Sequence, residues 1–366
     1  MAKRGENIYK RKDMRWEGRY IKGHDISGKV IFGYVYARSY AEAKDKLIAA
    51  KASYKNNTSL TKSFGAYCNE WLEVCKNRIK QSTYVKYHNI INKHIKPYFQ
   101  NYDLHFIDTV SISYFTDRLL DENISPKSAR DILSVLNSIL KYLNRQSSSS
   151  FILPEIVYPA NHPKDIRVLS VEEQTKLVAF LLCDMDNIKF GILLTLLTGM
   201  RIGEICALKW ADISVDDGTI TVSRSMQRLQ CFNDEISKTK VVVSSTKSRS
   251  SQRIIPLTAY TVSLCKQMQC KDNDSYVLTG KQNKYMEPRA LQYHLSKITK
   301  ECSLEGVHFH TLRHTFATRC VEVDFEIKSL SEILGHSNVK ITLDRYVHSS
   351  LELKRQNMDK LSTFGL

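Results

Sequence analysis

The sequence has no long hydrophobic segment. Its longest nearly uncharged apolar stretch runs from Phe190 to Met200, whereas a helix that spans a bilayer needs about 20 apolar residues. We therefore expect no membrane association. The N-terminus, MAKRGENIYKRKD, has no apolar stretch of the kind that a secretory signal contains, so we expect a cytoplasmic protein.

The signature motifs of several enzyme classes are also missing. The sequence contains no G-x-x-x-x-G-K-[ST], H-E-x-x-H, G-x-S-x-G or G-x-G-x-x-G. Their absence argues against nucleotide-driven, zinc-dependent and α/β-hydrolase chemistry. The 9 cysteines include no C-x-x-C pair, which is typical of reduced core thiols in a cytosolic protein.

Acidic residues are too few to balance the basic ones. The 54 Lys and Arg exceed the 38 Asp and Glu by 16, and such a surplus usually indicates a polyanionic partner, above all nucleic acid. Residues 1–55 alone hold 14 Lys and Arg against 6 Asp and Glu. The run Val30–Tyr36 is typical of a strand, and Ala41–Ala52 of a helix. We interpret this segment as a DNA-contacting sheet. The alternative is a sheet with a solvated basic face.

The rest of the chain is predicted to form two further domains. Apolar residues at helical spacing follow from Phe64 to Cys75, and again from Ile132 to Leu143, which predicts a helical domain. Between them, Ser82 can cap a helix that runs to about Ile95 and ends before Pro97. The segment 146–168 holds four consecutive serines and three prolines and reads as a linker. After it Ser170 and Glu173 form a capping-box pattern that opens a new domain. There we expect helices at about 171–183, 187–198 and 202–208, then strands within 212–257. The predicted domains are 1–56, 62–146 and 168–366.

Histidine, arginine and tyrosine gather in three segments of the last domain. These are TGMRIGEICALKW (198–210), HFHTLRHTFAT (308–318) and LGHSNVKITLDRYVH (334–348). In order and spacing they resemble the tyrosine recombinase (phage integrase) family, which includes the integrases of phages and conjugative transposons. The motifs cover the last 200 residues, and the domain layout resembles such integrases over the whole chain.

The resemblance implies a set of catalytic residues. Matched one by one, they are Arg201, Lys247, His310, Arg313, His336 and Tyr346. Lys238 and Lys240 compete with Lys247 for the position of the catalytic lysine. Glu204 matches an acidic position that supports Arg201, whereas His308 and His314 look like neighbours rather than catalysts. The resemblance implies no cofactor and no metal.

The chemistry of these side chains agrees with that assignment. Two guanidiniums, Arg201 and Arg313, can bind the non-bridging oxygens of a pentacoordinate phosphorus and stay charged at any working pH. The Tyr346 phenol can attack phosphorus and store the bond energy in a covalent link, so no ATP is needed. A lysine in a turn can protonate the leaving 5′-oxygen. His310 would take the phenolic proton or hold the phosphate, and His336 would donate a hydrogen bond to a phosphate oxygen.

The implied fold is a multidomain α+β arrangement. It comprises a small β-sheet DNA-binding module, a helical, SAM-like core-binding domain and a mixed, mainly α catalytic domain of the DNA breaking-rejoining fold. The implied function is site-specific recombination through a 3′-phosphotyrosyl intermediate that integrates and excises a mobile element. The implied partners are double-stranded DNA with core and arm-type sites, further protomers in a homotetramer, and an excisionase or DNA-bending protein. The tail 349–366 would dock on a neighbouring protomer.

Two other functions compete with this one. A type IB topoisomerase uses similar chemistry to relax supercoils, but the separate N-terminal module and linker argue against it. A non-catalytic DNA-binding regulator would keep the charge and lose the nucleophile. Singly, each candidate has a simpler explanation: Arg201 with Glu204 as a surface ion pair, His336 as a helix-end residue, Tyr346 as one of 19 tyrosines. Together they argue for the recombinase.

Overall fold

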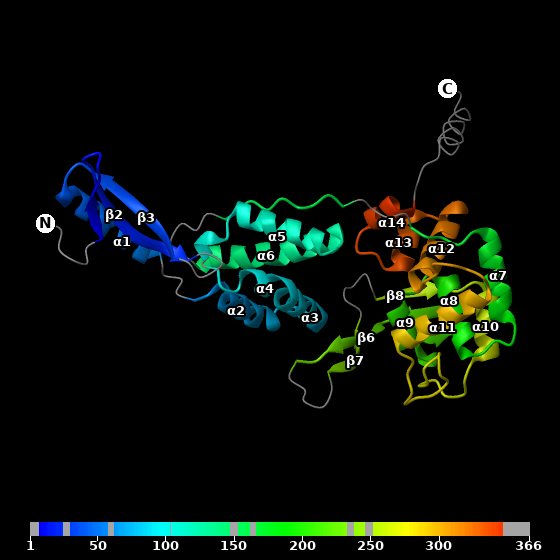
Figure 1. Ribbon diagram of the computed structural model, residues 1–366. Helices are drawn as coiled ribbons and strands as arrows, with labels where there is room; N and C mark the ends of the chain where they lie inside the picture. Colours follow the sequence, from blue (N-terminus) through cyan, green and yellow to red (C-terminus); the bar gives the residue numbers. More distant parts are fainter. Residues whose placement is uncertain are drawn as a thin grey trace, which may run out of the picture. The chain divides into compact units, whose positions relative to one another are not determined.

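The chain forms a multidomain arrangement of small antiparallel sheets and helices (Figure 1). It divides into two compact units, Met1–Pro163 and Lys164–Leu366. The computed structural model describes residues 7–24, 30–57, 62–102, 104–146, 153–161, 166–232, 238–245 and 252–346. The finer division into domains 1–56, 62–146 and 168–366 stays a prediction.

The first unit begins with a sheet and a helix. The sheet is antiparallel in the order β1-β2-β3, and its elements are β1 (Ile8–Lys10), β2 (Trp16–His24) and β3 (Val30–Ala37), followed by α1 (Tyr40–Asn57). One face of the sheet packs on α1 through buried Ile8 and Leu47. Gly18 allows this close approach, because a Cβ there would lie 3.3 Å from Leu47 Cβ on α1 and 2.9 Å from Val35 Cγ2 on the neighbouring strand. The strand and helix predicted here are both present.

The rest of the first unit is helical. Its elements are α2 (Phe64–Lys76), α3 (Gln81–Ile90), the π-helix η1 (Ile91–Ile95), α4 (Lys96–Phe99), the 3₁₀ helix η2 (Leu104–Phe106), α5 (Thr109–Asp121) and α6 (Pro126–Gln146). The apolar stripes on α2 and α6 are buried in one core, as predicted. The sequence predicted a helix end before Pro97, but the chain stays helical through that residue. Pro97 follows just after the π-helix η1, so the helix changes its hydrogen-bonding geometry just before the residue that has no backbone N–H.

The second unit combines helices with short strands. It contains α7 (Val171–Leu182), α8 (Asn187–Thr198), α9 (Ile202–Ala207), the 3₁₀ helix η3 (Trp210–Asp212), β4 (Ile213–Ser214), β5 (Thr219–Val222), β6 (Arg224–Gln230), β7 (Thr239–Ser245), β8 (Arg253–Pro256), α10 (Ala259–Met268), α11 (Pro288–Glu301), α12 (Phe309–Glu322), α13 (Ile327–Leu334) and α14 (Val339–Tyr346). The strands form an antiparallel sheet β4-β5-β8 and a hairpin β6-β7. As predicted, Ser170 caps α7 by accepting a hydrogen bond from the backbone of Glu173.

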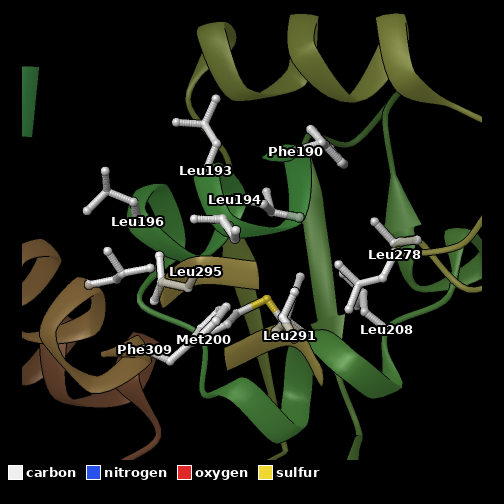
Figure 2. Close-up of a cluster of buried hydrophobic side chains, with 14 of the residues drawn as sticks. Phe190, Leu193, Leu194, Leu196, Met200, Leu208, Leu278, Leu291, Leu295 and Phe309 are labelled. Atoms are coloured by element: carbon white, nitrogen blue, oxygen red, sulfur yellow. The ribbon is translucent and has the colours of Figure 1, made fainter. Parts of the chain in front are cut away.

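Helix α8 lies in the centre of the hydrophobic core of the second unit. Its apolar residues are buried almost all round, which explains the unbroken apolar run in the sequence. Figure 2 shows Phe190, Leu193, Leu194 and Leu196 of α8 in one cluster with side chains from other segments, among them Leu278. Among the residues described, no helix is long and apolar enough to cross a membrane. The packing of α8 fixes the turn that follows it, where the candidate site begins.

Candidate active site

A left-handed turn at the end of α8 sets the direction of Arg201. Gly199 ends the helix with a φ of 66°, and a Cβ there would lie 2.5 Å from Phe316 Cδ1. Glycine is therefore required by both its conformation and its surroundings. Arg201 then stands at the N-cap of α9 with its side chain 33% exposed. The turn releases the chain from the core and presents the guanidinium at the edge of the unit.

Glu204 is a buried carboxylate that supports two arginines. Its Oε1 accepts a hydrogen bond from Arg201 Nη1 at 2.9 Å, and its Oε2 accepts one from Arg253 Nη2 at 2.8 Å. Burial alone would raise the pKa of Glu204, but the hydrogen bonds and charge of Arg253, with the charge of Arg201, lower it below its ordinary value. The carboxylate is therefore ionised, and the predicted support of Arg201 by Glu204 is confirmed.

Arg253 is a site residue that the sequence interpretation missed. It opens β8, where burial alternates so that Arg253 and Ile255 face inward. Besides its bonds to Glu204, its Nε donates to the carbonyl of Ile333. The available signal was this strand alternation, which places an arginine at a core-facing position.

Arg313 is a buried guanidinium on α12. Its side chain is 4% exposed, its Nη1 donates to the carbonyl of Gly199 at 2.8 Å, and its Nη2 donates to the carbonyl of Leu334 at 2.8 Å. Burial and the charge of Arg201 lower the pKa of Arg313 to about 9, which leaves it protonated at neutral pH. These bonds join α8, α12 and α13 around one positive charge.

The turn after α13 brings His336 to the same place. Gly335 ends the helix with a φ of 66°, and its carbonyl accepts a hydrogen bond from Arg201 Nη2 at 2.9 Å. His336 Nε2 lies 3.0 Å from Arg313 Nη2, and Nδ1 lies 2.8 Å from Thr342 Oγ1. Burial and the charges of Arg313 and Arg201 lower the pKa of His336 to about 3, so the ring is neutral.

Its neighbours determine the tautomer of this ring. A guanidinium can only donate, so Nε2 of His336 must accept, and Nδ1 carries the proton that it donates to Thr342. The sequence interpretation had His336 donate to a phosphate oxygen. In the structure both ring nitrogens are instead engaged with protein groups.

Tyr346 ends α14 as a buried side chain. It is 6% exposed and packs in a cluster with Ala317, Leu330 and Leu334. Its ring lies parallel to that of His336, with an angle of 4° and 6.5 Å between centroids. Burial raises the pKa of the phenol, and the charge of Arg313 opposes that rise. The phenol is therefore protonated at neutral pH.

The histidine that contacts this phenol is His314. Its Nδ1 lies 2.6 Å from Tyr346 Oη. The sequence interpretation treated His314 and His308 as neighbours and gave the phenolic proton to His310. Within the described part of the chain, His310 has no hydrogen bond to the phenol, although its ring lies 6.1 Å from that of His314, one turn further along the same helix face. The structure therefore puts His314, and not His310, in contact with the phenol.

The candidate lysines are the least defined part of the site. Lys247 lies outside the described residues. Lys238 is exposed, and Lys240 is an exposed residue of β7 opposite Leu229 in the hairpin. The assignment of Lys247 stays a prediction, and so does the tail 349–366, which also lies outside the described residues.

Comparison with known proteins identifies two matching family models. The model described as phage integrase family matches residues 167–352, and the phage integrase N-terminal SAM-like domain matches residues 63–120. Among curated relatives, a XerC-like tyrosine recombinase of Caldanaerobacter subterraneus is 25% identical over 93% of this chain and 94% of its own length. The ICEBs1 integrase of Bacillus subtilis is 24% identical over 82% of each chain.

Solved structures share the fold. The Tn1549 transposon integrase with circular intermediate DNA matches at a TM-score of 0.64 and 21% identity, over 81% of this chain and 99% of the other. The lambda integrase tetramer bound to a Holliday junction matches at 0.59 and 18%, over 96% and 99%. The predicted multidomain α+β fold is thereby confirmed. The first family model spans more than half of the 366 residues, and the chain accordingly belongs to the phage integrase family and is a tyrosine recombinase.

Proposed function

We propose that this recombinase cuts and rejoins duplex DNA at specific sites through a 3′-phosphotyrosyl bond to Tyr346, and that the reaction integrates and excises a mobile element. One observation carries the proposal. Arg313 and Arg201 donate to two consecutive carbonyls of the 334–336 turn. The histidine of that turn lies parallel to the ring of Tyr346. Two guanidiniums and a phenol thus meet around one short turn.

The charges of the site suit a phosphodiester. The guanidiniums of Arg201 and Arg253 lie close enough to Arg313 to lower its pKa, and Glu204 forms ion pairs with Arg201 and Arg253. These four side chains together carry a net charge of +2. A phosphodiester becomes more negative as it passes through pentacoordinate phosphorus, and preorganised guanidiniums stabilise that change. Each guanidinium has five N–H donors, so it can keep its protein contacts and still donate to a phosphate oxygen.

The proposed reaction exchanges one ester for another. The Tyr346 oxygen bonds to phosphorus and loses its proton, while the bond from phosphorus to the 5′-oxygen breaks. We assign the protonation of that leaving oxygen to Lys247, a general acid by resemblance. Rejoining reverses these steps, and because the bond energy is kept in the phosphotyrosine, no nucleotide is consumed.

A substrate that traps the adduct tests the nucleophile. In a suicide substrate, a nick lets the cleaved fragment diffuse away, so the parent chain should accumulate a denaturant-resistant protein–DNA species. Tyr346→Phe keeps the ring in its cluster and removes the attacking oxygen. DNA binding should survive and the adduct should vanish. An adduct formed by Tyr346→Phe would contradict the assignment, and site-independent relaxation of supercoiled DNA by the parent would favour a topoisomerase.

The exposed side chains of the N-terminal sheet are those expected of a surface that binds a second class of DNA site. On the face away from α1, Tyr9, Tyr34 and Tyr36 are 56%, 48% and 43% exposed. Arg19 lies over the ring of Phe32, with 3.8 Å from guanidinium carbon to centroid. Side chains of this kind contact phosphates and base edges when a sheet lies in a groove. We assign arm-type sites to this face and core sites to the two remaining predicted domains.

Charge reversal on the full chain tests this assignment. Arg19→Glu should abolish protection of the arm-type sites in a footprint and leave cleavage of a core-site substrate intact. Lys51→Glu is the matched control, because Lys51 is exposed on α1. The slope of log K against log salt is negative, and its magnitude should fall by about 0.9 for each DNA phosphate that the variant no longer neutralises. Equal footprints for the two variants would mean that this face does not read DNA.

Strand exchange requires more than one protomer. The lambda integrase that shares this fold was solved as a tetramer on a Holliday junction, and we extend that assembly to this chain as a homotetramer on DNA, with an excisionase or bending protein as accessory. Sedimentation with a synthetic Holliday junction should give four protomers per junction. Direct repeats at an insertion junction beside the gene would support the mobile element, and their absence would count against it.

A further inference from the structure

The proposed reaction leaves the proton of the nucleophile without a protein acceptor, and the structure offers one. His314 Nδ1 lies 2.6 Å from the Tyr346 oxygen, within the range of a strong hydrogen bond. The contact joins α12 to the end of α14, so it depends on the tertiary fold. Both groups are shielded from solvent: Tyr346 is buried and His314 is half-buried.

The protonation states of the two groups allow the phenol to donate and His314 to accept. Burial raises the pKa of Tyr346, so its hydroxyl keeps its proton at neutral pH. Burial and the nearby His310, Arg345 and Arg313 lower the pKa of His314 to about 4, so its ring is neutral. A neutral imidazole has one nitrogen that can accept. In the tautomer that carries its proton on Nε2, Nδ1 of His314 accepts a hydrogen bond from the phenol, which is the geometry that a proton transfer needs.

We propose that His314 is a catalytic residue, the general base that takes the phenolic proton as Tyr346 attacks phosphorus. The inference rests on the proposed function. In the forward step the O–H bond of the phenol breaks, its proton bonds to Nδ1, the phenolic oxygen bonds to phosphorus, and the 5′-oxygen leaves. In rejoining, the phosphotyrosyl bond breaks and the imidazolium returns its proton to the phenol.

Substrate binding should make this base stronger. The charged or titratable groups that act on His314 are His310 and Arg313 on its own helix and Arg345 beside the nucleophile, and each opposes a positive charge on the ring. A phosphodiester bound by the arginines brings a negative charge next to them. That charge offsets part of their repulsion, so His314 becomes a better proton acceptor only when DNA occupies the site.

The test separates basicity from position. In His314→Asn the amide oxygen is attached to Cγ, as Nδ1 is, so it can accept the hydrogen bond but cannot take the proton. His310→Asn is the matched control, with the same substitution four residues earlier on α12. Each variant of the full chain is made with Tyr346 and with 3,5-difluorotyrosine at that position, whose phenol is a much stronger acid and needs no base. Single-turnover cleavage of the suicide substrate is measured for all four.

The expected result is a selective rescue. His314→Asn should lower the cleavage rate by about 10² to 10⁴, the usual contribution of a general base, with unchanged DNA affinity. Difluorotyrosine should restore most of that rate in His314→Asn and none of the rate lost in His310→Asn. Melting curves report whether the variants fold, and His314→Gln replaces His314→Asn if the latter does not.

Two other results would overturn the inference. Cleavage by His314→Asn within about threefold of the parent would show that no general base acts at this position. A loss of rate that difluorotyrosine does not restore would reduce His314 to a structural contact. Failure of the proposed function looks different, because the parent chain itself would then form no adduct.

Discussion

Replacing Glu204 by glutamine should destabilise the second unit more than the loss of a charge from any exposed side chain. Glu204 is 3% exposed and accepts hydrogen bonds from Arg201 and Arg253. Glutamine keeps the size of the side chain but removes its charge, and its NH₂ group turns a donor toward guanidinium donors. Removing one partner of a buried ion pair costs about 3–5 kcal/mol, because the remaining charge stays desolvated. We expect a loss of unfolding free energy in that range.

Urea unfolding followed by tryptophan fluorescence measures this loss. Trp210 is 1% exposed and stacks on Phe190 in the core of the second unit, so its fluorescence reports on the unfolding of that unit. The other two tryptophans, Trp16 and Trp71, lie in the first unit and are replaced by phenylalanine in both parent and variant. The matched control is Glu287→Gln.

The control isolates burial from charge. Glu287 pairs with Arg228, and their side chains are 30% and 45% exposed. An exposed pair of this kind contributes at most about 1 kcal/mol. Added sulfate should also stabilise Glu204→Gln more than the parent, since an anion that binds the folded state replaces the missing negative charge. Equal losses for the two variants, or no difference in the response to sulfate, would refute the reasoning.

Three further predictions concern the general acid, the buried Arg313 and the pH dependence of the unfolding free energy. A 5′-thio leaving group needs little protonation, so it should restore cleavage to Lys247→Ala; restoration of Lys240→Ala instead would move the general acid to that residue. Arg313→Ala should cost about 3–4 kcal/mol of transition-state stabilisation in single-turnover cleavage, and the thio substrate should not restore it. His336 has a pKa of about 3 in the folded chain against 6.5 for an ordinary histidine. The unfolded state therefore binds more protons, and unfolding free energy should fall as the pH drops from 6.5 toward 3, by at most about 1.4 kcal/mol per pH unit, reduced by solvent screening. His336→Gln should flatten that part of a plot of melting temperature against pH, and an unchanged slope would contradict it.

The spacing of apolar and capping residues along the sequence was enough to predict most of the helices and strands. Apolar spacing on α2 and α6 placed their buried faces, and Ser170 with Glu173 marked the start of α7. These features depend on neighbours a few residues apart, which a sequence displays directly. The predicted helix end before Pro97 was wrong because the helix passes through a π-helical turn at 91–95 just before the proline and does not end there.

The order and spacing of the motifs were enough to indicate the family and the candidate residues Arg201, Arg313 and Tyr346. Glu204, three positions after Arg201, could be predicted as its partner, whereas the partners that lie far away in the sequence were decided by the tertiary structure. Arg253 stands 49 positions after Glu204, and His314 stands 32 before Tyr346, and no local pattern joins residues so far apart. Tertiary packing brings their segments together, as in the cluster that α12, α13 and α14 form around Tyr346, and desolvation there sets which groups carry protons. The sequence alone therefore determined which side chains are present for the chemistry, whereas the fold decided which of them touch.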